Sequence, residues 1–403
     1  MRSGATRTRG NRRVLSARAA VMVTGAFTLL AGTAVAAAPA AAGTEDRLRR
    51  DVREIERLGV AGVIAEARTP DGRFTARAGV ADRRTGRPAR PGDHFRGASV
   101  TKTYVATVVL QLIGEGRLSL DDTVDEWLPG LVRGNGNDGR RITIRHMLQH
   151  TSGLYDYVRD IAVLQSAEGY RERRFDRYTP ERLVAIALEH EPDFEPGAAN
   201  PDGTPKWNYS NTGYVLLGMI IKRVTGKDWR TQARDRVIRP LGLRDTRFPV
   251  HRATLPRPFL RGYHQYAADG PLTDTTLLDP SVAGASGALI TTVADDNRFF
   301  RALIGGRLVP RALFTEMQRT VPTGWDGAYE GSRYGLGLFW FPLRCDGAGY
   351  WAHNGDMLGY MVREGVRTDG GRSVSIAMSS QLAGDRAERQ NMAAAEAVRN
   401  ALC

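Results

Sequence analysis

Residues 97–106 read GASVTKTYVA and place Ser99 three positions before Lys102. Residues at this spacing share one face of a helix, so the lysine amine would lie beside the serine hydroxyl. An adjacent amine can activate a weak hydroxyl nucleophile without a histidine. The chain has only four lysines, and Lys102 alone has a serine three positions before it. The pair therefore predicts a nucleophile with an activating amine beside it.

Apolar side chains recur from Val100 to Ile113, and Gly114-Glu115-Gly116 ends the pattern. A stripe this broad predicts a helix that is buried over most of its surface. Lys102 would then be buried as well. Burial lowers the pKa of an amine because it disfavours the charged form, and only a neutral amine can act as a base.

Two distant segments carry further polar groups. Tyr209-Ser210-Asn211 supplies a phenol and an amide where a loop passes into the apolar helix predicted for residues 215–224. His353-Asn354-Gly355 is predicted to lie on a strand, where a glycine would let a substrate approach closely. These residues also have purely structural interpretations: Tyr209 as a half-buried phenol, Asn211 as a helix cap and Gly355 as a strand bulge.

These three segments, in this order, resemble the motifs of the penicillin-recognising serine hydrolases. That family includes D-alanyl-D-alanine carboxypeptidases, class C β-lactamases and related esterases and peptidases, and its Ser-x-x-Lys signature matches Ser99 and Lys102. The similarity extends over almost the whole chain after the first 43 residues. It includes residues 142–145 and 150–154, the Tyr-Gly-Leu-Gly-Leu run at 334–338, and the closing Cys403.

The resemblance implies a role for each residue. Ser99 would attack a carbonyl and form an acyl-enzyme, with Lys102 and Tyr209 as a coupled pair that moves the proton. Asn211 would hold the substrate amide and the lysine amine, and His353 would shape the electrostatics of the cleft. Asn354, Gly355 and Asp356 would also contact substrate. The backbone N–H groups of Ser99 and Asp356 would form the oxyanion hole. No cofactor or metal is implied.

Two positions depart from the carboxypeptidase pattern. Asn354 and Phe339 stand where such enzymes carry a threonine and an arginine for the substrate carboxylate, and Asp356 adds a negative charge. Another arginine, such as Arg344 or Arg363, would have to bind the substrate carboxylate in place of the missing threonine and arginine. The leading prediction is a secreted carboxypeptidase that penicillins acylate, acting on small peptide or β-lactam-like substrates, with cell-wall peptidoglycan as a partner. The alternatives are a D-aminopeptidase, amidase or esterase, and a non-catalytic cell-wall-binding protein.

Strand-like runs at both ends of the chain enclose a helical middle. Residues 60–67 and 73–80 predict a β-hairpin, and residues 334–341, 350–366 and 373–379 predict further strands. Residues 45–58 and 387–402 predict terminal helices. We therefore expect an α+β fold with an antiparallel sheet, flanked by the terminal helices and beside a mainly helical insertion. The sheet domain would comprise 44–95 and 285–403, and the helical domain 96–284.

The first 43 residues have the composition of an export signal. Six arginines and no acidic residue precede an apolar run over residues 19–36, and small residues suited to cleavage follow the run. Cleavage would lower the formal net charge from +13 to +7. The apolar run is short for a membrane anchor, and threonine and glycine residues interrupt it. The remaining arginines are scattered, which argues against nucleic acid binding. We expect a secreted protein without a stable membrane anchor, working as a monomer.

The chain has two cysteines, Cys345 and Cys403. In an exported protein an isolated pair predicts a disulfide in preference to a metal site or a reactive thiol. His146 and His150 have the spacing of a metal pair on a helix. Met147 stands where a metalloprotease helix would carry glutamate, and no third ligand is evident, so we expect structural histidines.

Overall fold

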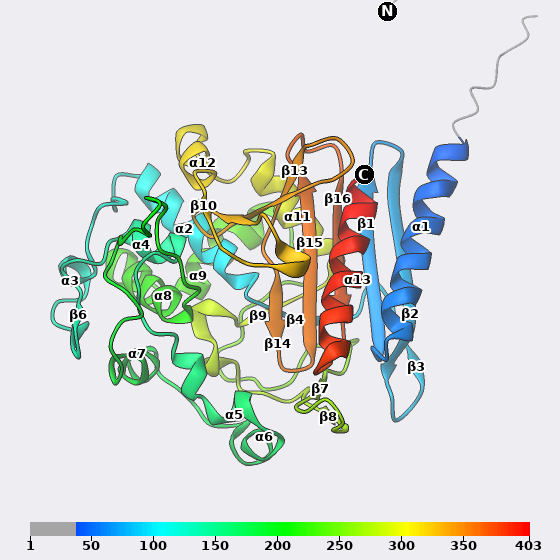
Figure 1. The fold of residues 1–403 in the computed structure, drawn as a ribbon, viewed down its shortest axis with the longest axis horizontal. Coiled ribbons are helices and arrows are strands. Elements are labelled where there is room, and N and C mark those ends of the chain that lie inside the picture. Colours follow the sequence, from blue (N-terminus) through cyan, green and yellow to red (C-terminus); the bar gives the residue numbers. More distant parts are fainter. Residues whose placement is uncertain (1–37) are drawn as a thin grey trace, which may run out of the picture. The chain divides into compact units, whose positions relative to one another are not determined.

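Strands from both ends of the chain pair in one large antiparallel sheet, in a computed structural model that describes residues 38–403 (Figure 1). The strand order is β10-β11-β12-β13-β15-β16-β1-β2-β3, and β14 pairs with β15 beside this path. The strands are β1 Gly62–Thr69, β2 Gly72–Asp82, β3 Arg87–Pro88, β10 Val321–Pro322, β11 Arg333–Tyr334, β12 Phe339–Pro342, β13 Gly349–Ala352, β14 Gly355–Met357, β15 Tyr360–Arg367 and β16 Ser373–Met378. The predicted α+β class and antiparallel sheet are confirmed.

The two faces of the sheet bury different residues of the same strand. On β1, Val63 and Ala65 pack into a cluster with the terminal helices α1 Ala38–Arg57 and α13 Asp385–Leu402, whereas Ile64 packs into the cluster on the other side. This alternation follows from the two-residue period of a strand. Figure 1 shows α1 and α13 along the same side of the sheet. The predicted terminal helices therefore cover one face together.

The middle of the chain is mainly helical, as expected. Its helices are α2 Thr101–Gly114, α3 Val124–Trp127, α4 Ile144–Gln149, α5 Ala162–Gln165, α6 Ala167–Arg173, α7 Pro180–Leu188, α8 Asn211–Thr225, α9 Trp229–Ala233 and α10 Arg239–Leu241, followed by α11 Val293–Ile304 and α12 Arg311–Met317. Short strands also occur: β4 Phe95–Ala98, β5 Arg133–Gly134, β6 Asn137–Asp138, β7 Tyr263–Gln265, β8 Leu272–Asp274, β9 Leu289–Thr291 and β17 Ser380–Gln381. β4 pairs with β9, so the start and end of this region meet.

Residues 38–403 form one compact unit. The division into domains of residues 44–95 with 285–403 and of residues 96–284 stays a prediction. The predicted signal peptide lies almost wholly outside the described residues. Among the helices of residues 38–403, none has the length and apolar character needed to span a membrane.

The strand predicted for residues 334–341 is wrong in its middle. β11 ends at Tyr334 and β12 begins at Phe339, so residues 335–338 form a turn. In this turn the Gly335 N–H donates to the Leu338 carbonyl at 2.8 Å. Gly337 has φ +77°, and a Cβ there would come within 2.4 Å of the Ala106 side chain. The turn forms because glycine tolerates this conformation and lets the backbone pack against α2.

Cys345 and Cys403 form the predicted disulfide, with their Cα atoms 6.0 Å apart. It ties the end of the chain to a loop 58 residues earlier in sequence. Closing a loop of this length in the unfolded chain stabilises the fold by about 4 kcal/mol in the chain-entropy treatment. We expect the double variant Cys345→Ser/Cys403→Ser to melt several degrees lower in calorimetry, about the shift that wild type shows under reducing agent. An unchanged melting temperature would contradict this.

Candidate active site

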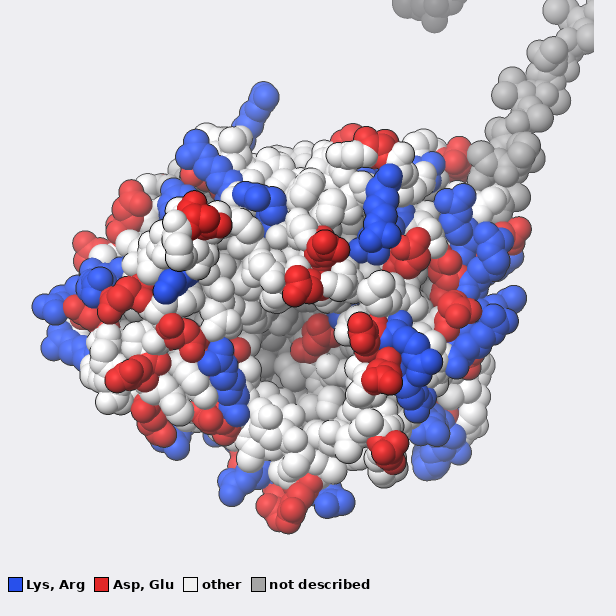
Figure 2. Space-filling model, in the orientation of Figure 1, with Lys and Arg blue, Asp and Glu red and all other residues white. Residues whose placement is uncertain are grey.

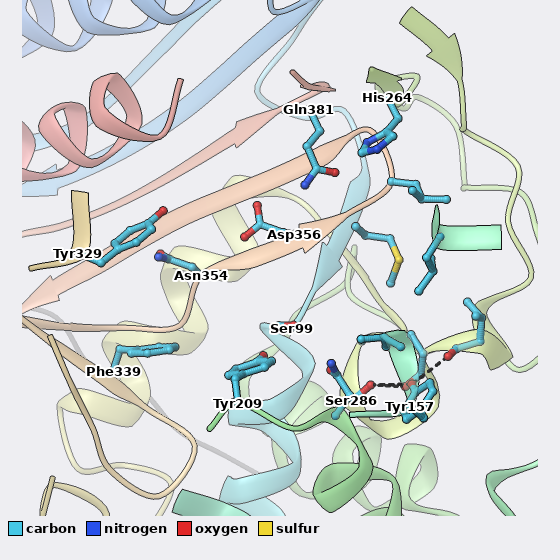
Figure 3. Close-up of a pocket in the computed structure, with 18 of the residues that line it drawn as sticks. Ser99, Tyr157, Tyr209, His264, Ser286, Tyr329, Phe339, Asn354, Asp356 and Gln381 are labelled. Carbon is cyan, nitrogen blue, oxygen red and sulfur yellow. Dashed lines mark hydrogen bonds between the residues drawn. The ribbon is translucent and has the colours of Figure 1, made fainter. Parts of the chain in front are cut away.

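Ser99 lies in the turn between β4 and α2, at the floor of a pocket (Figure 3). Ala98, just before it, has φ +48°, which is unusual for a residue with a side chain. The Thr101 hydroxyl donates to the Ala98 carbonyl at 2.7 Å and accepts the Leu289 N–H at 3.0 Å, and these bonds hold the turn. Lys102 therefore lies one turn after Ser99, in the first turn of α2.

Lys102 is completely buried, as predicted. Its Nζ lies 2.7 Å from Asn211 Oδ1, 2.8 Å from the Ser286 carbonyl oxygen and 3.2 Å from Ser99 Oγ. The first two atoms can only accept hydrogen bonds, so they take two N–H groups of the amine. A neutral amine has one lone pair left, and its third partner is the Ser99 hydroxyl. The geometry thus allows Ser99 to donate its proton to Lys102.

Burial lowers the pKa of Lys102 to about 7, although the nearby carboxylate of Asp156 acts to raise it. Near neutral pH the Lys102 amine is therefore uncharged in a large fraction of the molecules. The pKa of Tyr209 moves the opposite way: burial raises it well above its ordinary value, and a hydrogen bond with Ser99 opposes the rise. Lys102 Nζ lies 4.7 Å from the centre of the Tyr209 ring. The unprotonated form of Lys102 is therefore more accessible than that of Tyr209, so Lys102 is the better candidate for the base and Tyr209 keeps its proton.

Asn211 begins α8 and is oriented by a buried carboxylate, Asp156. The Asn211 Nδ2 donates to Asp156 at 2.9 and 3.2 Å, and its backbone N–H donates to the same carboxylate at 3.1 Å. These bonds turn Oδ1 of Asn211 toward Lys102. Burial raises the pKa of Asp156, and the bonds from Asn211 oppose that rise. A line of contacts thus runs from Asp156 through Asn211 and Lys102 to Ser99.

The third segment is less regular than predicted. β13 ends at Ala352 and β14 begins at Gly355, so His353 and Asn354 lie between strands, and the prediction that all three residues share one strand is wrong. The cause is a side chain: the His353 N–H donates to the carboxylate of Glu364 in place of a neighbouring strand. Gly355 behaves as predicted for a close approach, because a Cβ there would lie 2.3 Å from the Gly97 carbonyl oxygen.

His353 is buried and does not line the pocket. Its Nδ1 lies 2.9 Å from the Asn354 carbonyl oxygen, which can only accept, so Nδ1 carries the proton. Nε2 then accepts from the Tyr334 hydroxyl at 3.0 Å. Burial lowers the pKa of His353 to about 3, and the charge of Lys102 adds to the effect. A neutral His353 therefore supports Asn354, which does face the pocket.

The two histidines at the spacing of a metal pair, His146 and His150, have structural contacts. His146 Nδ1 accepts the Thr143 N–H and caps its own helix, and His150 Nδ1 accepts the Ser210 N–H at 3.2 Å. The His150 ring also packs against Tyr209 at 4.3 Å between ring centres. Within residues 38–403, no three His, Cys, Asp or Glu side chains cluster as metal ligands would.

The pocket above Ser99 has a volume of about 390 Å³. Figure 3 shows Tyr329 and Phe339 on one side of Ser99, and Tyr157, Ser286 and His264 on the other. The further lining residues are Val158, Leu164, Tyr209, Asn211, Val282, Ala283, Gly287, Trp325, Asn354, Asp356, Met357, Leu358 and Gln381. Figure 2 shows the hollow from outside, with mostly uncharged surface inside it, an acidic side chain on its wall, and both acidic and basic side chains farther around it.

Asp356 is the one carboxylate among the residues that line this pocket, and none of them is lysine or arginine. Arg363 lies behind it, with only 3% of its side chain exposed. One of its Nη atoms donates to Asp356 Oδ1 at 3.0 Å and to Asn391 Oδ1 at 2.9 Å. Neither Arg363 nor Arg344 lines the pocket, so neither replaces the arginine missing at Phe339.

The sequence matches the Beta-lactamase family over residues 14–399, which is nearly the whole chain. The chain belongs to the Beta-lactamase family. The solved structure of a D-stereospecific amidohydrolase from Streptomyces sp. is similar, with a TM-score of 0.77 and 41% identity over 86% of this chain and 97% of that one. Together with the site geometry, this makes the chain a serine hydrolase of the β-lactamase and penicillin-binding protein fold.

Two curated members of the wider group show how varied it is. Penicillin-binding protein 4 of Amycolatopsis lactamdurans is 28% identical over 69% of this chain and 70% of its own length. Esterase EstB of Burkholderia gladioli is 36% identical, and the match spans about half of each protein, 52% of this chain and 51% of the esterase. The Beta-lactamase family thus includes proteins named for different substrates, and the pocket itself must indicate which class fits here.

Two important residues of this Beta-lactamase family member, Asp156 and Glu364, escaped prediction, and a third, Arg363, was predicted only as a replacement for the missing carboxylate-binding arginine. Asp156, Glu364 and Arg363 lie outside the recognisable motifs, although each touches a motif residue. Asp156 interrupts the apolar run of residues 154–158, and the adjacent charges of Arg363 and Glu364 interrupt that of residues 360–366; charges in such stretches were the available signal. Buried charges require partners, so each of them indicates a nearby polar site.

Proposed function

We propose that the protein hydrolyses amides and short peptides of apolar D-amino acids that have a free amino group. The observation that carries this proposal is the charge of the pocket, which presents one carboxylate and no lysine or arginine among its lining residues. Such a pocket suits a substrate ammonium better than a substrate carboxylate. The similarity to a D-stereospecific amidohydrolase supports the same class. The pocket thus favours an amidase or aminopeptidase over a carboxypeptidase.

In the proposed reaction Ser99 Oγ forms a bond to the substrate carbonyl carbon while its proton passes to the neutral amine of Lys102. The oxygen of the carbonyl becomes an oxyanion, held by the backbone N–H groups of Ser99 and Asp356. The C–N bond then breaks, and the leaving nitrogen takes a proton from Tyr209, which Lys102 replenishes. A water molecule then adds to the carbonyl carbon of the acyl-enzyme and gives a proton to the same pair. The bond between that carbon and Ser99 Oγ breaks, the pair returns the proton to Ser99 Oγ, and the acid product leaves.

Asp356 is placed to receive the substrate ammonium. Its Oδ1 is held by Arg363, and 42% of its side chain is exposed to the pocket, which leaves Oδ2 free for a second partner. Figure 3 shows Asn354 and Gln381 on either side of Asp356, and their amide oxygens could share the ammonium. The apolar lining residues, such as Leu164, Met357 and Leu358, would take the substrate side chain.

The decisive experiment compares D-phenylalanine amide with its N-acetyl derivative, its L enantiomer and a diacyl-Lys-D-Ala-D-Ala peptide. We expect the highest kcat/KM for D-phenylalanine amide. The variant Asp356→Asn should lower that value between tenfold and a hundredfold, about the loss of one charged hydrogen bond, and should leave the N-acetyl substrate unaffected. Asp71→Asn, on the exposed turn between β1 and β2, is the matched control. Faster release of D-alanine from the peptide would overturn the proposal.

The rate should depend on pH through Lys102. Because the neutral amine is the base, kcat/KM for an ester without a titratable group should rise tenfold per pH unit below about pH 7 and level off above it. Tyr209 should cause no fall below pH 10, since its pKa is raised. An ester is needed because the α-amino group of an amino acid amide would itself titrate in this range.

Asp156 provides the control for this assignment. Its charge raises the pKa of Lys102, so Asp156→Asn should move the acid limb of the profile to lower pH. If the acid limb of the Asp156→Asn profile stayed at the same pH, another group would control the rate.

We also propose that residues 1–43 direct export and are then removed. Their composition supports this, with arginines before an apolar run and small residues after it. Amino-terminal sequencing of protein recovered from the culture medium should give a start near residue 44. Protein that keeps its first residues and stays inside the cell would contradict export.

A further inference from the structure

Two adjoining cavities outside the active site are lined by arginines. The first, of about 400 Å³, is lined by Arg252, Arg257 and Arg261 and by no carboxylate. The second, of about 330 Å³, shares Arg257 and Arg261 and adds Arg84, Arg87 and Asp82. Phe259 lines both. The two cavities thus flank the segment 257–259 and form one surface, which we call the arginine surface.

The charges of this surface are only partly neutralised. Arg261 donates to Asp82 at 3.2 Å and to Asp274 at 2.6 Å, and Arg87 donates to the buried Asp93 at 2.9 Å. Arg252 and Arg257 are exposed, and within residues 38–403 neither forms an ion pair. Two guanidinium groups are therefore available to an anion from solution.

The first cavity also has a buried cation beneath it. Arg96 is 4% exposed, and its Nη2 donates to the carbonyl oxygens of Ala253, Thr276 and Leu278 at 2.7, 3.1 and 3.0 Å. Among residues 38–403 only carbonyl oxygens accept hydrogen bonds from Arg96, and its Nε is buried without a partner there. These bonds fix the backbone on either side of the cavity, while the charge adds to its positive potential. The cavity is thus rigid and positive before any ligand arrives.

We propose that the arginine surface binds a phosphate-bearing polyanion, with adjacent phosphates in the two cavities. Guanidinium groups match phosphate oxygens because their planar fork donates two parallel hydrogen bonds. Two adjoining cavities suit a repeating anion better than a single one. The hydroxyl of Thr254, which accepts from Arg252 Nε at 3.1 Å, is a further lining group that could donate.

The position of the surface leaves the active site open. β7 begins two residues after Arg261, and its His264 lines the active-site pocket. Figure 1 shows β3, β7 and β8 together at one end of the described unit. The bound polyanion would therefore hold the enzyme to an anionic matrix close to the rim of the pocket without filling it.

The test measures binding of fluorescent inorganic polyphosphate at a series of salt concentrations. We expect Arg252→Ala/Arg257→Ala to weaken binding at low salt at least about tenfold, as the loss of charge-assisted hydrogen bonds implies. The slope of log K against log salt should fall in magnitude by about 0.7 for each lost phosphate contact. Hydrolysis of D-phenylalanine amide should not change, which shows that the variant is folded.

The control is Arg171→Ala/Arg182→Ala, which removes the same charge from exposed positions outside both cavities. Equal weakening in this control would overturn the proposal, because net charge would then explain the binding. Absence of binding by wild type would also overturn it. Tighter binding of duplex DNA at equal phosphate concentration would assign the surface to nucleic acid instead.

Discussion

Ser99→Ala should reduce hydrolysis of every substrate by about 10⁶-fold, the loss seen when a serine hydrolase is deprived of its nucleophile. No other hydroxyl lies within hydrogen-bond reach of the Lys102 amine among the described residues, since its remaining partners are the Asn211 side-chain oxygen and the Ser286 carbonyl. The change removes one oxygen from a partly exposed side chain, so the melting temperature should hardly move.

Mass spectrometry makes the result specific. Wild type incubated with penicillin should gain the mass of one penicillin, on a peptide that contains Ser99, and the variant should gain nothing. An adduct on the variant would place the nucleophile elsewhere. A wild-type protein that forms no adduct with penicillin and hydrolyses no amide or ester would be a binding protein that has only the fold.

Lys102→Met is expected to lower kcat/KM by about 10⁴-fold, the upper range for loss of a general base. Methionine fills a similar volume and keeps Ser99 in place, so the loss would report proton transfer. Lys227→Met, at an exposed lysine after α8, is the matched control and should keep full activity.

A second readout of Lys102→Met is the pH dependence of stability. Burial lowers the pKa of Lys102 to about 7 in the fold, against about 10.4 in the unfolded chain, so the unfolded state binds the extra proton between these values. Wild type should therefore gain stability as pH rises from 7 toward 10.4, and the variant should lack this gain. If the free energy of unfolding changed with pH in the same way in both proteins over this range, that result would contradict a neutral, buried Lys102.

Local patterns in the sequence were sufficient for several elements. The alternating runs on either side of Thr69-Pro70-Asp71-Gly72 predict the hairpin that β1 and β2 form. The apolar stripe after Ser99 predicts α2 and the burial of Lys102. These features depend on periodicity and turn chemistry, which neighbouring residues determine. The strand predicted through residues 335–338 failed because Gly337 packs against a helix more than two hundred positions away in the chain.

The sequence by itself determined the family and the sheet with its terminal helices, and it predicted Ser99, Lys102, Tyr209 and Asn211 as site residues, since each belongs to a recognisable motif. Only the tertiary structure showed that Asp156 orients Asn211, that Glu364 breaks the third strand, and that Arg363 holds Asp356 instead of facing substrate. The physical reason is that a buried charge interacts with groups within a few ångströms, and the fold decides which groups those are. No local period or spacing records those partners, and in this protein one of them, Arg363, holds the one carboxylate among the residues that line the pocket.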